Sequence, residues 1–218
     1  MTNYIKGYQA DSYFLFVDVE TNGLPKKRNR HYSEIDIWPR IVQMSWGIYD
    51  INGNLVKLED HIIKPDGFEI DKKSESIHGI SNEKALAEGK NINDIIEIFL
   101  NDLKLKNLKS VICHNVNFDI NVIKSELFRL DKKIKLNKLE VICTMLATTE
   151  FCELPSNFSD YKYPKLEELY QLLFEEGMDN AHDSKYDVIN LAKCFFSLLH
   201  NDTIEKIGIK QNIKFIKS

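Results

Sequence analysis

Residues 14–25 read FLFVDVETNGLP, an apolar strand that ends in two acidic residues before a turn. Neighbours i and i+2 of a strand lie about 6.6 Å apart on one face, so Asp18 and Glu20 share a face opposite that of Val17. Both faces are apolar, which predicts an interior strand. Carboxylates in such a place repel each other and lose hydration, and one divalent metal would compensate both. The alternative is a solvated pair beyond the sheet edge that caps the turn.

Two more strands are expected, at residues 40–50 and 54–65. The pair Asn52 and Gly53 between them is a strong hairpin signal, because both central residues of the favoured turn need positive φ. The chain therefore opens with a three-stranded antiparallel meander. The connection of residues 21–39 is long for a compact domain, and such connections are usually functional or mobile. The basic residues of this connection are expected to be solvated, and contact with phosphate groups is the alternative. They are Lys26, Lys27, Arg28 and Arg30.

Helical patterns begin at Ser81, which can cap a helix that stops at Gly89, and residues 92–104 repeat apolar side chains at helical spacing. A short apolar strand at residues 110–115 and further helices at about 118–130, 165–177 and 183–200 are expected. Leading strands, followed by alternating helices and a strand without a repeat or linker, predict one mixed α/β domain over residues 1–218. The short basic tail from Lys206 is expected on the surface.

Composition restricts the partners that this chain can have. Its 29 lysine and arginine residues against 33 aspartate and glutamate residues give a net charge of -4, which argues against a broad surface that tracks duplex phosphates. A small nucleic-acid footprint stays compatible with this charge, especially where bound metals supply positive charge. The four cysteines form no C-x-x-C pair, which favours a reduced protein over a disulfide framework or zinc site. Without a signal-like or membrane-spanning apolar run, the cytoplasm is the expected location.

A third acidic residue lies on an apolar helix stripe. If Asn117 caps the helix that follows, then Asp119, Ile123 and Leu127 fall on one face, so Asp119 belongs to the core-facing stripe. The alternative is that Asp119 is in the first turn only for its favourable interaction with the helix dipole.

The last helix repeats this arrangement. Asp187 shares a face with Leu191, Asp183 can cap the helix, and His182 lies in the loop before it. His182 taken alone is more often a surface or hydrogen-bonded histidine than a catalyst. The conjunction changes the interpretation, because chance seldom gives four carboxylates at the end of an apolar strand or in the first turn of an apolar helix, together with a histidine five residues before the last acid.

These residues carry a resemblance to the DEDDh 3′→5′ exonucleases. The three motifs of that family are matched by FVDVETNGL, HNVNFD and HDSKYD, and the similarity extends through RIVQMSWGIYD, IHGIS and YPKLEELYQLLF over about residues 12–199. A histidine near the final acid favours the DEDDh branch over the DEDDy branch, which has a tyrosine there. The resemblance implies a ribonuclease H-like three-layer α/β fold, with a central mixed sheet of three antiparallel strands followed by parallel strands, flanked by helices.

The resemblance also implies a mechanism with two divalent ions, Mg²⁺ or Mn²⁺, that activate water and stabilise the leaving oxygen. Asp18, Glu20 and Asp187 would bind the first ion. Asp18 would bridge to the second ion, which Asp119 would support. His182 would be the general base, and the product would be a 5′-mononucleotide.

Recognition of the 3′-terminal nucleotide would involve residues on two walls of the site. By resemblance they are Thr21, Asn22, Gly23 and Leu24 on one wall and His114, Asn115 and Phe118 on the other. Leu24 and Phe118 fit the core equally well. Asn22 and Ser184 replace a threonine and an alanine that are frequent in the family, and both are expected near the nucleotide, where they would affect substrate preference.

The implied substrate is nucleic acid with a free 3′ end, with single-stranded DNA expected first. A DNA polymerase is a candidate partner, no membrane partner is expected, and the oligomeric state is open. Two alternatives are a hydrolase of short oligonucleotides or small phosphodiesters, RNA included, and a non-catalytic nucleic-acid-binding module. The intact set of four acids and a histidine argues against the binding module.

Overall fold

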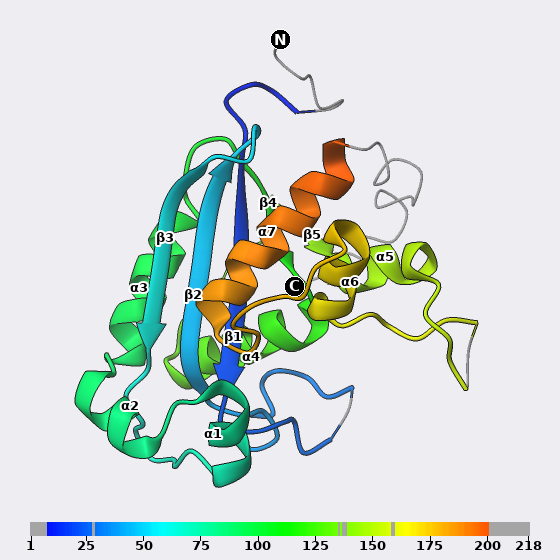
Figure 1. Ribbon diagram of the computed structural model, residues 1–218. Helices are drawn as coiled ribbons and strands as arrows, with labels where there is room; N and C mark the ends of the chain where they lie inside the picture. Colours follow the sequence, from blue (N-terminus) through cyan, green and yellow to red (C-terminus); the bar gives the residue numbers. More distant parts are fainter. Residues whose placement is uncertain (1–7, 28, 135, 137–138, 158–159, 201–218) are drawn as a thin grey trace.

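The computed structural model describes residues 8–200 apart from 28, 135, 137–138 and 158–159. Within these residues the strands form one five-stranded sheet in the order β3-β2-β1-β4-β5 (Figure 1). The strands are β1 (Tyr13–Thr21), β2 (Ile41–Asp50), β3 (Leu55–Ile62), β4 (Leu108–Cys113) and β5 (Glu140–Cys143). The first three pair antiparallel, whereas β1, β4 and β5 run parallel, so the predicted mixed sheet is confirmed.

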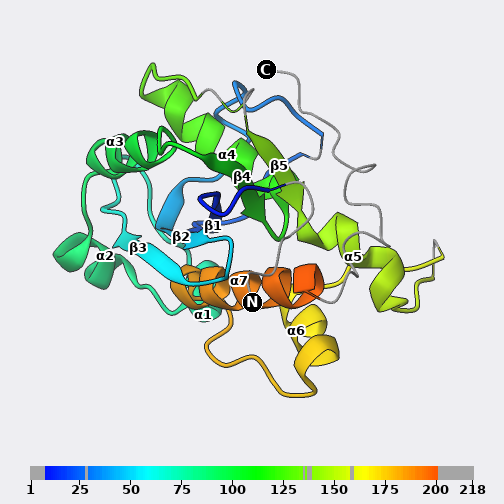
Figure 2. The same cartoon turned by 90° about the horizontal axis from the view of Figure 1, so that it is seen from above.

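Helices lie on both faces of this sheet (Figure 2). One face is covered by α7 (Ser184–His200), with α6 (Leu166–Phe174) packed on it, and the other by α3 (Ile92–Asp102) and α4 (Val116–Arg129). The remaining described helices are α1 (Lys72–His78), α2 (Asn82–Glu88) and α5 (Thr144–Cys152). The expected three-layer α/β fold is therefore confirmed.

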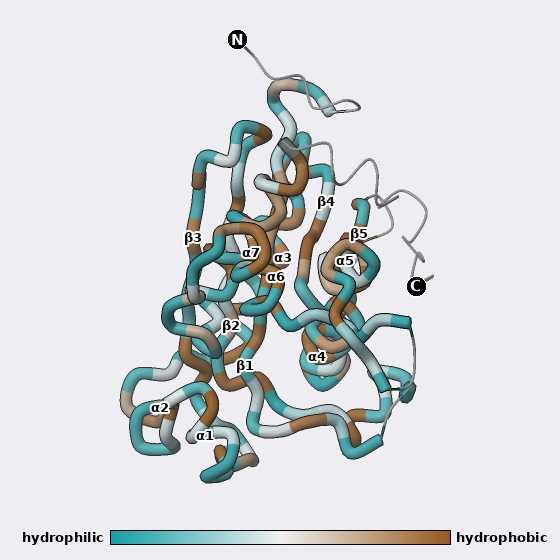
Figure 3. The backbone as a smooth tube through the Cα atoms, turned by 45° about the vertical axis from the view of Figure 1, so that its right-hand side comes forward, coloured by the Kyte–Doolittle hydropathy of each residue, from teal (hydrophilic) through white to brown (hydrophobic). Residues whose placement is uncertain are grey.

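The central strand β1 is buried on both faces. Phe14 and Phe16 pack against Phe195 of α7, with ring centroids 5.6 and 5.3 Å apart. Leu15 and Val17 belong to the opposite core cluster, which α3 and α4 complete. Full burial of such a side chain is worth roughly 1.5–3 kcal/mol, which explains why both faces of the strand are apolar. Figure 3 shows hydrophobic segments inside the molecule and hydrophilic ones on the connecting loops.

The hairpin between β2 and β3 forms where it was predicted, but with another turn. Gly53 has φ 82, whereas Asn52 is not among the residues with positive φ. The Gly53 N–H donates to the Asp50 carbonyl at 3.1 Å, and the Asp50 N–H donates to the Asn54 carbonyl at 3.0 Å. A Cβ added at Gly53 would also lie 3.3 Å from the Phe196 ring. The expectation that both residues of the pair have positive φ is therefore wrong.

Helix α4 begins earlier than predicted. Asn115 precedes its first residue, Val116, whereas Asn117 was the expected cap. The Asn115 side chain makes no cap hydrogen bond, although asparagine is a favoured residue type at this position. The predicted face is nevertheless present, because Asp119 and Ile123 are both buried.

Helix α1 and strand β5 were not predicted, and α5 was not singled out as a helix. Helix α1 is polar apart from Ile77 and is delimited by Asp71, whose carboxylate accepts the Ser74 N–H at 2.7 Å, and by Gly79 with φ 72. Strand β5 has only four residues. Both lack the apolar periodicity from which the longer elements were predicted.

Other expectations concern the whole chain. All four cysteines are free thiols, as expected. Among the helices of the described ranges, none is long and apolar enough to cross a membrane. Arg28 of the basic run and the tail from Lys206 lie outside the described residues.

Candidate active site

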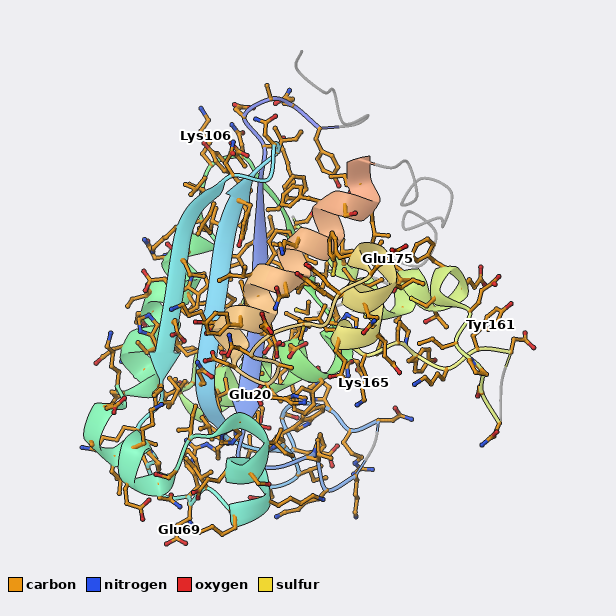
Figure 4. The ribbon with its side chains drawn as sticks, viewed as in Figure 1. Glu20, Glu69, Lys106, Tyr161, Lys165 and Glu175 are labelled. Atoms are coloured by element: carbon orange, nitrogen blue, oxygen red, sulfur yellow. The ribbon has the colours of Figure 1, made fainter. Side chains whose placement is uncertain are left out.

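Acidic side chains gather at the carboxyl end of β1. Asp18 and Glu20 are among the last four residues of this strand. Asp119 lies in the first turn of α4, and Asp187 lies in the first turn of α7. Figure 4 shows Glu20 near the start of α7, at the opposite end of the sheet from Lys106. Because β1 and β4 are parallel, their carboxyl ends lie at the same edge, where open α/β sheets usually bind ligands.

Burial and mutual repulsion dominate the electrostatics of this carboxylate cluster. Burial raises the pKa of Asp18 well above its usual range, and the charges of Asp119 and Asp187 raise it further. Burial, followed by the same two charges, raises the pKa of Glu20 to about 8. Burial also raises the pKa of Asp119 to about 8, although backbone hydrogen bonds oppose it. Asp18 and Glu20 are both half-buried and belong to β1, so they are not a solvated pair beyond the sheet edge.

The fourth carboxylate contacts the loop that carries the predicted base. Burial raises the pKa of Asp187 to about 7, against the effect of the His182 N–H, which donates to Asp187 Oδ2 at 3.2 Å. A ring nitrogen of His182 and carboxylate oxygens of Glu20 and Asp187 all lie within 4.8 Å of one another. The His182 side chain is exposed, so its ring borders the open side of the cluster, where water is available.

The donor set fits a divalent cation. Asp187 Oδ1 is buried and has no hydrogen-bond partner among the described residues, and such an unsatisfied acceptor is costly unless something else binds it. Several carboxylate oxygens together suit hard ions such as Mg²⁺ and Mn²⁺. A cation would also relieve the repulsion that raises the four carboxylate pKa values.

The predicted nucleotide-binding residues of the β1–β2 connection differ in exposure. Thr21 is buried, and its hydroxyl donates to the Gly23 carbonyl at 2.6 Å. Leu24 is 79% exposed, so it is not part of the core. A register shift between Glu20 and Thr21 turns the strand at this point, as bulges beside functional sites often do.

Asn22 has a structural use for its side chain. Its Oδ1 accepts the Arg40 N–H at 2.8 Å, and its Nδ2 donates to the Glu69 carbonyl at 3.3 Å. The asparagine that replaces the family's threonine therefore joins the start of the β1–β2 connection to its end and to the segment before α1.

The opposite wall contains the other three predicted contacts. Both ring nitrogens of His114 are engaged, Nδ1 with Thr144 Oγ1 at 3.0 Å and Nε2 with the Pro164 carbonyl at 2.9 Å. Burial lowers the pKa of His114 to about 4, so the ring is neutral near pH 7. Asn115 precedes α4, and Phe118 is half-buried against the core cluster of α3 and α4. Nucleotide contact by these residues stays a prediction.

Sequence reasoning missed a set of polar residues beside the cluster. Gln43 and Ser45 lie on β2, are 4% and 0% exposed, and pair in register with Glu20 and Asp18. The signal was available, because two polar residues at i and i+2 of an apolar strand are the pattern that singled out Asp18 and Glu20. Ser184 was expected near the nucleotide. Its side chain is completely buried, and its nearness to a nucleotide stays a prediction.

The comparison with protein families decides the identity. The RNase T-type exonuclease family matches residues 15–195, which include all four acids and the histidine. The chain belongs to this exonuclease family. The predicted resemblance to the DEDDh exonucleases and the expectation of an exonuclease enzyme are thereby confirmed.

Individual relatives agree with this assignment. The DNA polymerase III subunit epsilon of Buchnera aphidicola is 29% identical over 211 residues, which cover 93% of this chain and 81% of that protein. A zinc-bound complex of Escherichia coli exonuclease I with single-stranded DNA has a similar fold, with a TM-score of 0.70, 19% identity and 90% of this chain covered. This chain spans only 42% of that one. The nuclease domain of 3′hExo, a DEDDh family member bound to rAMP, has a TM-score of 0.67 and 12% identity, with 89% of this chain and 95% of that chain covered.

Proposed function

We propose that this exonuclease removes 5′-mononucleotides from the 3′ end of single-stranded DNA, that it depends on two divalent ions, and that residues 1–218 form one exonuclease domain. The observation that carries the proposal is the convergence of four acids with raised pKa values and one exposed histidine at one end of the sheet. Strongly perturbed carboxylates in one place indicate a catalytic site.

Each residue of the cluster has a separate role in this proposal. Asp18, Glu20 and Asp187 would hold one divalent ion, and Asp119 with Asp18 would hold the other. Bound Mg²⁺ or Mn²⁺ supplies positive charge against the phosphate and lowers the pKa of water. The His182 imidazole takes the proton of the attacking water, since it borders the open side of the cluster and only its backbone N–H is used by Asp187.

The β1–β2 connection would hold the terminal nucleotide. Leu24 presents an exposed apolar side chain there, with Thr21, Asn22 and Gly23 beside it. His114, Asn115 and Phe118 would form the opposite wall. Stacking on apolar side chains tolerates every base, so little sequence preference is expected.

A DNA polymerase is the protein partner that we propose, because one relative is named as a polymerase subunit. The single-stranded DNA in the exonuclease I complex supports DNA over RNA as the first substrate to test. The proposed place of action is the cytoplasm.

The test is degradation of 5′-labelled single-stranded DNA and of matching RNA with Mg²⁺, Mn²⁺ or EDTA. A metal-dependent ladder that shortens from the 3′ end supports the proposal, and internal cuts or no cleavage overturn it. Asp187→Asn keeps the side-chain volume and should abolish the ladder. Asp94→Asn makes the same change at an exposed residue of α3 and should leave it intact. Substrates of increasing length separate an exonuclease from a hydrolase of small phosphodiesters, and a 3′-phosphate should block the reaction.

A further inference from the structure

The first turn of α7 is joined to the sheet by the side chains that lie opposite the metal-binding acids. In the antiparallel pair of β1 and β2, Gln43 faces Glu20 across the ladder and Ser45 faces Asp18. Directly opposite residues of such a pair project to the same face of the sheet. Both β2 side chains therefore point to the face that α7 covers.

The amide of Gln43 is fully used. Its Nε2 donates to Asp60 Oδ1 at 2.9 Å and to Asp183 Oδ1 at 3.0 Å, and its Oε1 accepts the Ser184 N–H at 3.3 Å. The partners fix the orientation of the amide, since two carboxylate oxygens can only accept and a backbone N–H can only donate. A single side chain thus joins β3, β2 and the start of α7.

Other hydrogen bonds strengthen this connection. Asp183 Oδ1 also accepts the Lys185 N–H at 3.1 Å, which confirms Asp183 as the cap of α7. The Ser45 hydroxyl donates to Asp60 Oδ1 at 2.8 Å and lies 2.6 Å from the Ser184 hydroxyl, which therefore donates to it. The serine that replaces the family's alanine is accommodated in this network.

The residue that this network holds in place is His182. Its φ is 68, a conformation that is uncommon outside glycine and that persists only where the surroundings impose it. On one side its N–H is bound by Asp187. On the other side the next residue is Asp183, whose carboxylate is bound by Gln43.

We infer that Gln43 is a positioning residue that fixes the turn of residues 182–187 against the strand of Glu20, and so sets the place of the His182 ring over the acids. This inference rests on the proposed function of that site. Supporting side chains of this kind matter because small displacements of reacting groups lower rates strongly.

The test compares Gln43→Leu with Met44→Ala. The first change keeps the volume and removes all three hydrogen bonds. The second removes a fully buried side chain from the same strand but from the opposite face, away from the site. With single-stranded DNA and saturating Mn²⁺, Gln43→Leu should lower kcat by about 10- to 100-fold with KM within about threefold of wild type. Met44→Ala should lose stability and keep kcat. A Gln43→Leu kcat within about twofold of wild type, or equal losses of kcat in both variants, overturns the inference.

A second measurement does not depend on activity. Amide hydrogen exchange of Ser184 and Lys185, followed by NMR, should be at least about tenfold faster in Gln43→Leu and unchanged in Met44→Ala. If the wild-type protein does not shorten DNA, the proposed function fails, and exchange alone decides the inference. Faster exchange confined to the start of α7 then supports it, and unchanged exchange overturns it.

Discussion

His182 illustrates how one exposed side chain can matter more than its burial indicates. Its ring nitrogen lies within 4.8 Å of carboxylate oxygens of Glu20 and Asp187, yet the ring is open to water. A general base needs both conditions, since it must reach the attacking water and release the proton afterwards.

His182→Ala should therefore lower the single-turnover rate by about 10²–10⁴ while Mn²⁺ and oligonucleotide binding stay nearly intact. His31→Ala is the control, because His31 is also an exposed loop histidine, bound to Ser33. A rate within about threefold of wild type, which corresponds to only about 0.7 kcal/mol of barrier, would refute the catalytic role. Loss of Mn²⁺ binding would instead make His182 a ligand.

Asp18 is subject to the repulsion of four other acids, Asp119, Asp187, Glu20 and Asp183, and the variant Asp18→Asn tests that repulsion directly. The amide keeps the volume but removes a ligand charge, so turnover and Mn²⁺ binding should both collapse. In EDTA the same variant should melt at a higher temperature than wild type, because an amide can be buried there without the desolvation and repulsion that make the Asp18 carboxylate costly. A gain of 1 kcal/mol corresponds to about 2–4 °C for a chain of this size, and differential scanning fluorimetry resolves it. Near-normal activity would contradict the metal assignment.

Residue-scale predictions from the sequence worked where a polar residue interrupts an apolar stripe. Asp18, Glu20, Asp119 and Asp187 were all found in this way. Gln43 follows the same pattern on β2, but a neutral amide carries no charge that demands compensation, so it was not singled out. Partners such as Asp60 lie on another strand, and periodicity holds no information about such contacts.

Among the elements, α4 links the acids to the long β1–β2 connection. Glu126 is 1% exposed and accepts from Arg40 Nε at 2.8 Å and from the Ile41 N–H at 3.2 Å. Arg129, one turn further on, lies 3.2 Å from Glu126 and donates to the Trp38 carbonyl at 2.8 Å. Asp119 is on the same helix, so these contacts of Glu126 and Arg129 fix the position of the β1–β2 connection relative to an acid of the site.

Glu126→Ala should destabilise the protein by about 3–5 kcal/mol, because it leaves the charges of Arg40 and Arg129 partly buried without a counter-ion. Glu34→Ala breaks the exposed pair with Arg30 and should cost about 1 kcal/mol or less. Urea unfolding measures both free energies. Equal losses in the two variants would show that burial of the Glu126 pair adds nothing.

Elements were predictable in proportion to their apolar periodicity and their caps. Helix α2 has both Ser81 and Gly89 and was placed correctly, as its bounds of Asn82–Glu88 show. Helix α1 has a capping aspartate and a terminal glycine but no apolar stripe, and it was missed. The start of α4 was placed two residues late because Asn115 and Asn117 are the same favoured cap residue type, and the sequence does not distinguish them. Hydrophobic patterns indicate which face of a helix is buried more reliably than they indicate the residue at which the helix begins.

At the scale of the whole molecule, the parallel pairing of the later strands was implied by the family resemblance and not by any local pattern. Nothing in the apolar runs of β1 and β4 states that they pair parallel or that α7 crosses β1 and β2. Those contacts are long-range, and they are what brings Asp187 and His182 to Glu20. The site could be predicted as a set of residues, whereas its geometry needed the fold.

The pH dependence of stability is a property of the whole molecule that the acids should dominate. The pKa values of Glu20 and Asp119 are raised to about 8 and that of Asp187 to about 7, against about 4 in an unfolded chain. The folded state therefore binds these protons more tightly. Their contribution to stability is fully present below about pH 4 and is lost as the pH rises through about 7–8.

The pKa shift of His114 has the opposite effect on the pH dependence of stability, and it acts over a different pH range. Burial lowers its pKa to about 4, so the folded state favours the neutral ring, and the stability that this gives is complete once the pH exceeds the unfolded value of about 6.5. Above about pH 7 the acids alone should then set the slope. In EDTA the melting temperature should fall between about pH 7 and pH 8. Saturating Mg²⁺ or Mn²⁺ should remove much of the fall, because a bound cation compensates the carboxylates and stabilises only the folded state. Scanning fluorimetry at fixed ionic strength measures this, with Asp119→Asn as the variant expected to show a shallower slope. A melting temperature that rises over this interval without metal would contradict the raised pKa values and, with them, the crowded cluster of acids.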